Sequence, residues 1–391
     1  MKRGLILLML CFTGGQLMAL DVWVRLFSDR NLTEVTVQPD SGLFHLIAYN
    51  HDFTVRDTVY DAFAADDESD ITLTKKGNYI NVKVHGADVG TYPAVQIFSA
   101  DSQFVYRIKG YGKERKYYGD LQLRPYEEFL QVVNKVNLEK YVAGVVESEA
   151  GHVDELEFYK AQAVLARTFA LKNLRKHWSD GYNLKDDVTS QVYFSKARYK
   201  NAALIEEAVR ATRDTVLVTM ECEPILGAFH ANSGGFTVDA KDAWLSSVDY
   251  LVSRPDSFSI NTGSYHWEKR IPKNKYYNYF ARMMGVSNDA NLHKALLNFD
   301  QEQRQSHFTY KGKSLKLTKV RFDFGLKSTY FSTEEEGNYI VLNGNGYGHG
   351  VGLSQDGAII MSEKGYNYRD ILCFYFTDVD FEAVKFADIV Q

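Results

Sequence analysis

The stretch NLEKYVAGVVESEAG, residues 137–151, marks the place where the hydrophobic pattern of the chain changes. Before it, apolar and polar residues alternate as they do in β-strands. Within it, Leu138, Val142 and Val145 recur at the spacing of one helix face, and Asn137 is a residue type that caps helix starts. The sequence therefore predicts that a sheet-rich region gives way to helices here.

The region before this helix, residues 20–131, consists of short alternating runs such as DVWVRLF and NYINVKV. Turn-forming segments such as KKGN and GADVG separate these runs. This pattern is typical of β-strands joined by tight turns. We expect a β-rich N-terminal domain over 20–131.

The region after it, residues 132–391, mixes helical and strand patterns without regular βαβ alternation. The polar stretch 269–304 is expected to be a helical insertion. Further helices are expected at 155–177 and around 203–211, and strands near Val216 and Ile225. The predicted fold class is α+β, in which a sheet-rich N-terminal region precedes a mixed helix and strand region.

The first 19 residues have the pattern of a secretory signal peptide. Lys2 and Arg3 precede an apolar run that is too short to span a bilayer, and the segment ends at the small residue Ala19. The alternative is a buried first helix. We expect 1–19 to be a signal peptide, and the chain to be exported to the periplasm or cell envelope, soluble or peripherally associated. No later segment has the length of a membrane helix.

The composition excludes some partners. The formal net charge is -5 and no long run of one sign occurs, so no nucleic-acid partner is expected. The chain has 26 tyrosines and 24 phenylalanines, which suit either a core or stacking on sugar rings. Cys222 and Cys373 follow the predicted signal peptide, and whether they pair is left open.

Two glutamates near the end of the 137–151 helix differ in their predicted environment. At 100° per residue, Glu147 falls opposite the apolar arc and is expected to be solvated. Glu149 falls inside the arc, where a carboxylate must be paired or must open into a cleft. Burial would raise its pKa, as a general acid requires. The alternative is a structural ion pair at the helix end.

The stretch GNGYGHGVGLSQDGA, residues 344–358, has a glycine at alternate positions from Gly344 to Gly352. It does not match a dinucleotide fingerprint or a P-loop, because the glycine spacing is wrong and no Gly-Lys-Ser/Thr follows. The period of two predicts an extended strand with one bare face. Its other face would carry Asn345, Tyr347, His349 and Val351. Ser354 is expected to cap a helix that runs to Lys364.

A second group of small residues, Ser233, Gly234 and Gly235, is expected to form a tight turn or a loop whose amides contact a ligand. His230 lies nearby in the sequence. Together with His349 it could suggest a metal site, but two histidines far apart in sequence are weak evidence.

Six segments in this order resemble the SpoIID/LytB family, which comprises stage II sporulation protein D and its relatives. They are NLEKYVAGVVESEAG, KAQAVLARTFAL, QVY, ANSGG, DAWLSSVDYL and GYGHGVGLSQDGA. The resemblance covers about Arg115 to about Phe376. It implies that 132–391 is the catalytic domain of this family.

The resemblance implies a lytic transglycosylase of peptidoglycan, without a cofactor. Such enzymes cut the β-1,4 bond between N-acetylmuramic acid and N-acetylglucosamine and leave a 1,6-anhydro end; the sporulation enzyme prefers strands stripped of stem peptides. The family's essential acid closes its G-V-V-x-x-E motif, which places it at Glu149. The implied substrate-binding residues are Gln191, Tyr193, Ser233, Gly234, Gly235, Tyr347, His349 and Gln355.

The chain departs from the family pattern in three places. Ala150 and Gly151 stand where Met-Pro is common, and Asp214 stands where glycine is usual. DDVTSQVY lacks the cysteines with which some members bind zinc, so no metal is expected. An alternative function remains open: a non-catalytic glycan-binding module that recruits or stimulates a cell-wall amidase.

Overall fold

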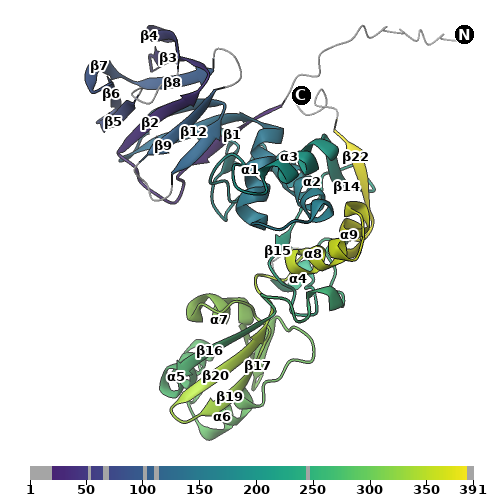
Figure 1. Ribbon diagram of the computed structural model, residues 1–391. Helices are drawn as coiled ribbons and strands as arrows, with labels where there is room; N and C mark the ends of the chain where they lie inside the picture. The colour runs from purple at the N-terminus through teal and green to yellow at the C-terminus, as the bar shows by residue number, and fades with distance from the viewer. Residues whose placement is uncertain are drawn as a thin grey trace, which may run out of the picture.

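The computed structural model describes residues 20–51, 54–64, 70–99, 104–109, 114–243 and 247–384. The expected signal peptide, 1–19, lies outside the described residues. Figure 1 shows an elongated molecule in which N-terminal sheets, a helical centre and a mixed unit at the far end follow one another. The α+β prediction is confirmed. No helix within the described ranges is long and apolar enough to cross a membrane.

Two antiparallel-rich sheets form the N-terminal part. One has seven strands in the order β13-β1-β12-β11-β8-β3-β4, and the other has six in the order β10-β9-β2-β5-β6-β7. Their bounds are β1 Asp21–Leu26, β2 Glu34–Ser41, β3 Leu43–Tyr49, β4 Val55–Ala64, β5 Ile71–Lys76, β6 Tyr79–Val84, β7 Ala87–Tyr92, β8 Ala94–Ser99, β9 Val105–Lys109, β10 Arg115–Tyr118, β11 Asp120–Tyr126, β12 Phe129–Asn137 and β13 Leu184–Lys185. Residue 131, the expected end of this region, falls inside β12.

The burial of β1 and β3 follows their sequence alternation, whereas β12 is buried at consecutive positions. In β1, Val22, Val24 and Leu26 are buried and the residues between them are more exposed. One continuous apolar core joins both sheets to the helices that follow. The sheets therefore share one core with the first helix, which continues directly from β12.

Helix α1 spans Leu138–Ala150, as its sequence predicts. The side chain of Asn137 accepts hydrogen bonds from the backbone N–H groups of Glu139 (3.0 Å) and Lys140 (3.4 Å), so the predicted cap is confirmed. Gly151 follows with φ 67°, a conformation that favours glycine.

Helix α2 spans Leu156–Lys172 and is shorter than the 155–177 expected from sequence. Asn173 caps its C-terminal end: both its backbone N–H (3.1 Å) and its side-chain amide (2.8 Å) donate to the carbonyl of Phe169. Turns and a short 3₁₀ segment, Trp178–Asp180, follow.

Helix α3 spans Ala202–Ala211 and leads into β14, Thr215–Thr219, which pairs with β22, Val379–Ala383. The strand expected near Val216 is therefore confirmed. The strand expected near Ile225 is wrong: only a single bridge, between Val218 and Pro224, follows the turn. Proline has no N–H group with which to extend a ladder.

Residues 266–345 form a separate unit with its own apolar core. Its elements are β16 His266–Pro272, α5 Lys273–Met284, α6 Ala290–Leu297, β17 His307–Tyr310, β18 Lys313–Lys316, α7 Leu317–Phe324, β19 Phe331–Glu336 and β20 Tyr339–Asn345. Helices α5 and α6 lie within the 269–304 range expected to be helical, and that range begins inside β16. We call residues 266–345 the inserted unit; it lies at the end of the molecule remote from the N-terminal sheets (Figure 1).

The alternating glycines do not form the extended strand that their spacing predicts. Strand β20 ends at Asn345, and Gly346, Gly348, Gly350 and Gly352 have φ of 81°, 110°, 85° and 71°. This sign of φ turns the backbone at every second residue, so the prediction of a strand over 344–352 is wrong. We call residues 346–352 the glycine loop.

The C-terminal elements enclose the glycine loop. The short strands β15, Phe229–His230, and β21, Leu353–Ser354, pair in parallel. Helix α8, Gln355–Glu363, begins as predicted at Ser354, whose hydroxyl oxygen accepts the N–H of Gly357 at 3.4 Å. Helices α4 and α9 span Ala240–Ala243 and Tyr368–Tyr375.

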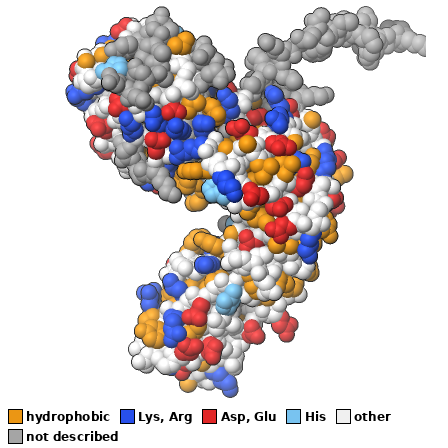
Figure 2. All heavy atoms as spheres, in the orientation of Figure 1, with side chains coloured by type: hydrophobic (Ala, Val, Ile, Leu, Met, Phe, Trp, Pro, Cys, Tyr) orange, Lys and Arg blue, Asp and Glu red, His pale blue; other side chains and the backbone are white. Residues whose placement is uncertain are grey.

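On the face shown in Figure 2, acidic side chains are frequent over the helical centre, and basic ones gather over the N-terminal sheets near their junction with it. The charge of the chain is therefore unevenly distributed on this face.

Candidate active site

A groove of about 780 Å³ runs between the end of α1, the end of α2, β15 and the glycine loop. We call it the Glu149 groove. Among the residues that line it are Glu149, Phe169, Asn173, Lys176, Gln191, Phe229, His230, Arg321, Tyr347, Gly348, His349 and Gln355. Segments far apart in sequence therefore meet around one carboxyl group.

Glu149 lies near the end of α1 and is partly buried, as its place in the apolar arc predicts. One carboxyl oxygen, Oε1, accepts the backbone N–H of Val192 at 2.7 Å. Burial raises the pKa of Glu149, and the hydrogen bond from Val192 opposes that rise in part. No basic side chain among the described residues forms an ion pair with it, so the alternative of a structural ion pair is not what the structure shows.

Glu147 is not the solvated residue that the helical wheel predicts. Its side chain is buried, and Oε1 accepts the backbone N–H groups of Arg198 and Tyr199, each at 2.9 Å. The prediction is wrong because the segment 194–199 covers this face of α1. Both glutamates bind backbone amides, but on opposite sides of the helix and in different cavities.

Two glutamines flank Glu149. Gln191 is 2% exposed, its Oε1 accepts the hydroxyl of Tyr141 at 3.3 Å, and its Nε2 has no partner among the described residues. Gln355 donates from Nε2 to the main-chain carbonyl of Glu149 at 3.2 Å. Gln355 therefore joins the start of α8 to the end of α1, whereas the amide nitrogen of Gln191 is buried in the groove wall.

Tyr347 and His349 reach the groove from the glycine loop. Tyr347 is 45% exposed, so its ring presents a surface to a ligand. His349 accepts the N–H of Val351 at Nδ1 (3.0 Å), and burial together with nearby arginines lowers its pKa to about 4. The ring of His230 lies 5.6 Å from that of His349, and burial also holds its pKa well below the ordinary value.

Both imidazoles are therefore neutral at pH 7. Within the described ranges, no group of three or more His, Cys, Asp or Glu residues could hold a metal ion.

Four of the expected site residues lie behind the groove rather than on its surface. Tyr193 is fully buried, its ring 5.0 Å from that of Tyr141. Ser233 is also buried and donates to Asp256 at 2.8 Å. Gly234 has φ 75°, and a Cβ there would lie 2.9 Å from the backbone of Asn345; Gly235 has φ 98° in the same turn. These residues support the walls of the groove.

Two arginines of the inserted unit were not predicted. Arg321, from α7, lines the groove. Arg304 donates to the carbonyls of Gly348 (2.9 Å) and Ser233 (3.4 Å), and burial lowers its pKa to about 9. A Cβ at Gly350 would overlap the guanidinium of Arg304, so this glycine is required by the approach of an arginine from another segment. Local sequence carries no signal of that approach.

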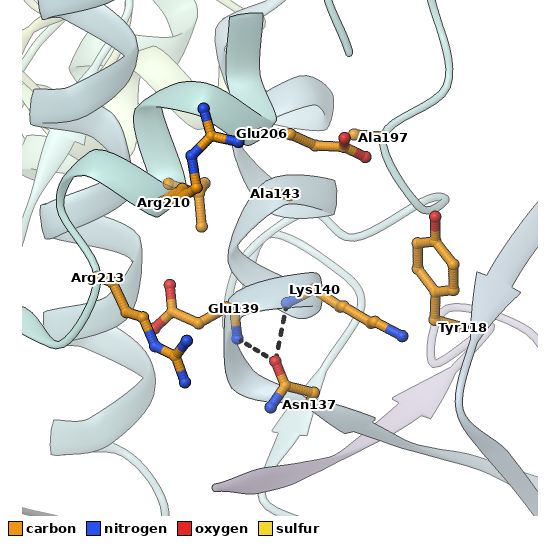
Figure 3. Close-up of a pocket in the computed structure, with 10 residues that line it drawn as sticks. Tyr118, Asn137, Glu139, Lys140, Ala143, Ala197, Glu206, Arg210 and Arg213 are labelled. Carbon is orange, nitrogen blue, oxygen red and sulfur yellow. Dashed lines mark hydrogen bonds between the residues drawn. The ribbon is translucent and has the colours of Figure 1, made fainter. Parts of the chain in front are cut away.

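A separate cavity of about 360 Å³ lies beside the start of α1, between Tyr118, Lys140 and Arg213 (Figure 3). Its wall includes Glu139, whose carboxylate pairs with the buried Arg167 at 2.6 Å. The carboxylate of Glu139 is therefore already bound by a guanidinium group. We therefore place the candidate active site in the Glu149 groove.

The region around the Glu149 groove is similar to known proteins. A family model described as stage II sporulation protein, SpoIID, matches residues 126–218, which include Glu149 and Gln191. Stage II sporulation protein D of Bacillus subtilis is 32% identical over 265 residues, covering 63% of this chain and 74% of that protein. The chain belongs to the SpoIID family.

Other relatives of this SpoIID family chain share less. An uncharacterized protein of Brachyspira hyodysenteriae is 29% identical over 314 residues, covering 78% of this chain and 80% of that protein. The amidase enhancer of Bacillus subtilis is 26% identical over 289 residues, covering 60% of this chain and 39% of that protein.

Proposed function

We propose that this chain acts at the cell wall as an exported lytic transglycosylase, which cleaves the β-1,4 bond between N-acetylmuramic acid and N-acetylglucosamine in peptidoglycan strands. Export by the signal peptide expected at 1–19, and a preference for peptide-stripped strands, are part of the proposal. One observation carries it: the carboxyl group of Glu149 stands in an open groove, and burial raises its pKa. Membership of the SpoIID family supports it.

The chemistry needs one group that first donates and then accepts a proton. Since Oε1 of Glu149 accepts the N–H of Val192, the acidic proton resides on the other oxygen. It passes to the glycosidic oxygen as the bond to the muramic anomeric carbon breaks. The carboxylate then removes the proton of the muramic 6-hydroxyl, whose oxygen bonds to that carbon and closes the 1,6-anhydro ring.

The lining of the groove fits this single-acid route. Glu149 is the one carboxylate among the described residues that line it. Retaining hydrolases need a second carboxylate about 5 Å away, and inverting ones need a second carboxylate further off. Attack by the substrate's own hydroxyl requires neither. The exposed ring of Tyr347 suits packing against the apolar face of a sugar.

The test is product analysis. The mature chain is incubated with intact and peptide-stripped sacculi, and products are examined by mass spectrometry for 1,6-anhydromuramic ends. Glu149→Gln should abolish them with the fold intact. Glu206→Gln, at an exposed carboxylate on α3, is the matched control and should leave them unchanged. Absence of anhydro ends from both substrates would refute the proposal.

A second candidate is a non-catalytic glycan-binding module that recruits or stimulates a cell-wall amidase. The similarity to the amidase enhancer of Bacillus subtilis favours it. It predicts that Glu149→Gln still binds sacculi, and that products appear only when an amidase is added. Anhydro ends formed by the purified chain alone would exclude it as the sole function.

A further inference from the structure

The wall of the Glu149 groove that faces the inserted unit carries positive charge without a compensating acid. Arg321 of α7 lines the groove, and its Nε donates to the carbonyl of Leu326 at 3.3 Å. No other hydrogen bond or ion pair joins its guanidinium to a described residue. Its two terminal nitrogens are therefore left for a ligand.

The surroundings add to this charge. Arg304 lies close enough to Arg321 for their charges to interact, and it too forms no ion pair with a described carboxylate. The charge of Arg321 also acts on His230 and His349, which stay neutral. Holding two guanidinium groups partly out of water without a counterion costs free energy, which an anionic ligand group would offset.

Two exposed aromatic rings lie next to cations of the inserted unit, and one of these rings, that of Tyr347, lines the groove. Phe322 is 77% exposed, with its ring centre 5.6 Å from the guanidinium carbon of Arg321. The ring of Tyr347 lies 5.5 Å from Nζ of Lys327. Aromatic faces pack against sugar rings, and cations next to them are suited to an acidic sugar substituent.

We infer that Arg321 determines specificity in the Glu149 groove by binding a carboxylate of the glycan, through the paired geometry that a guanidinium offers. The inference rests on the proposed function. Muramic acid offers two sources of such a group: its lactyl ether when no peptide is attached, and the stem peptide when one is. A carboxylate on Arg321 would orient the muramic ring, and with it the bond that meets Glu149 on the other side of the groove.

Calorimetric titration of the mature chain carrying Glu149→Gln, which prevents cleavage, tests this. Three soluble glycans of equal length are compared: stripped strands with free lactyl carboxylates, the same strands after amidation, and strands with stem peptides. We expect one carboxylate-bearing glycan to bind about 10- to 100-fold more tightly than the amidated strand. Which of the two does so identifies the source of the carboxylate.

In the Glu149→Gln chain, the further substitution Arg321→Gln should remove the preference for the carboxylate-bearing glycan. Arg321→Lys in its place should keep part of that preference. Arg282→Gln, at an exposed arginine of α5 in the same unit, makes the same change in net charge and should leave the preference intact. The amidated strand tests the inference without any substitution at Arg321.

Equal binding of all three glycans, or an equal effect of Arg282→Gln and Arg321→Gln, would overturn the inference and leave the proposed function standing. Failure of every glycan to bind would refute both.

Discussion

Replacing Gly350 by alanine tests whether the glycine loop is shaped by Arg304. The added Cβ would overlap Nη1 of Arg304 and lie 2.8 Å from its guanidinium carbon, and φ at this position is 85°. The backbone strain alone costs about 1–2 kcal/mol. The displaced guanidinium would lose hydrogen bonds to Gly348 and Ser233, which at about 1.5 kcal/mol each adds roughly 3 kcal/mol.

We therefore expect Gly350→Ala to lower the free energy of unfolding by about 4–5 kcal/mol in urea titrations followed by tryptophan fluorescence. Gly312→Ala is the matched control, because Gly312 has φ 73° and nothing within 4 Å of the added Cβ. It should cost only the strain, about 1–2 kcal/mol.

The same substitution should also reduce formation of anhydro ends. Gly348 accepts a hydrogen bond from Arg304 and lies between Tyr347 and His349, so its displacement moves both groove residues. A shift of about 1 Å can lower a rate roughly 100-fold. Equal losses of stability in Gly350→Ala and Gly312→Ala would refute the role assigned to Arg304.

Four further predictions concern ionisable side chains that are buried or partly buried. Because burial raises the pKa of Glu149, the rate of cleavage should fall as pH rises through that raised pKa. A pH profile of the rate whose alkaline limb lies at the ordinary value of 4.5 would contradict this. The folded state favours the neutral form of Glu149. The free energy of unfolding should therefore decrease as pH rises from 4.5 through the raised pKa. Glu149→Gln should therefore not destabilise the chain at pH 7, as thermal unfolding at pH 4 and pH 7 can show. Glu147→Ala should instead cost about 1–3 kcal/mol, because the amides of the 198–199 turn lose their acceptor; an unchanged melting temperature would disprove this. Arg167→Met should cost about 3–5 kcal/mol in urea unfolding by leaving Glu139 without its cation, and the double variant with Glu139→Gln should recover part of that loss.

The candidate acid was predictable because its determinants are local. The helical period of Leu138, Val142 and Val145 and the cap at Asn137 fix which way each α1 side chain points, so Glu149 falls on the inward face. That the inward face opens into a groove was not predictable from the helix.

Other features depended on contacts between segments distant in sequence. Glu147 is buried because the 194–199 segment crosses its face of α1, which no helical wheel can show. The glycine spacing suggested a strand, since period two is the strand signature. The positive φ angles instead accompany close contacts with distant segments: Gly350 with Arg304, Gly346 with Gly234 and Gly352 with Ala228.

Sequence by itself thus determined helix α1 and its cap, the cap of α8, the strand-rich first region and the inward acid, because hydrophobic period and capping act within a few residues. Tertiary structure alone decided the burial of Glu147, the path of the glycine loop and the cationic wall at Arg321. These features depend on which distant backbones and charges pack together. The spacing of apolar and polar residues within a single segment does not determine the free energy of that packing.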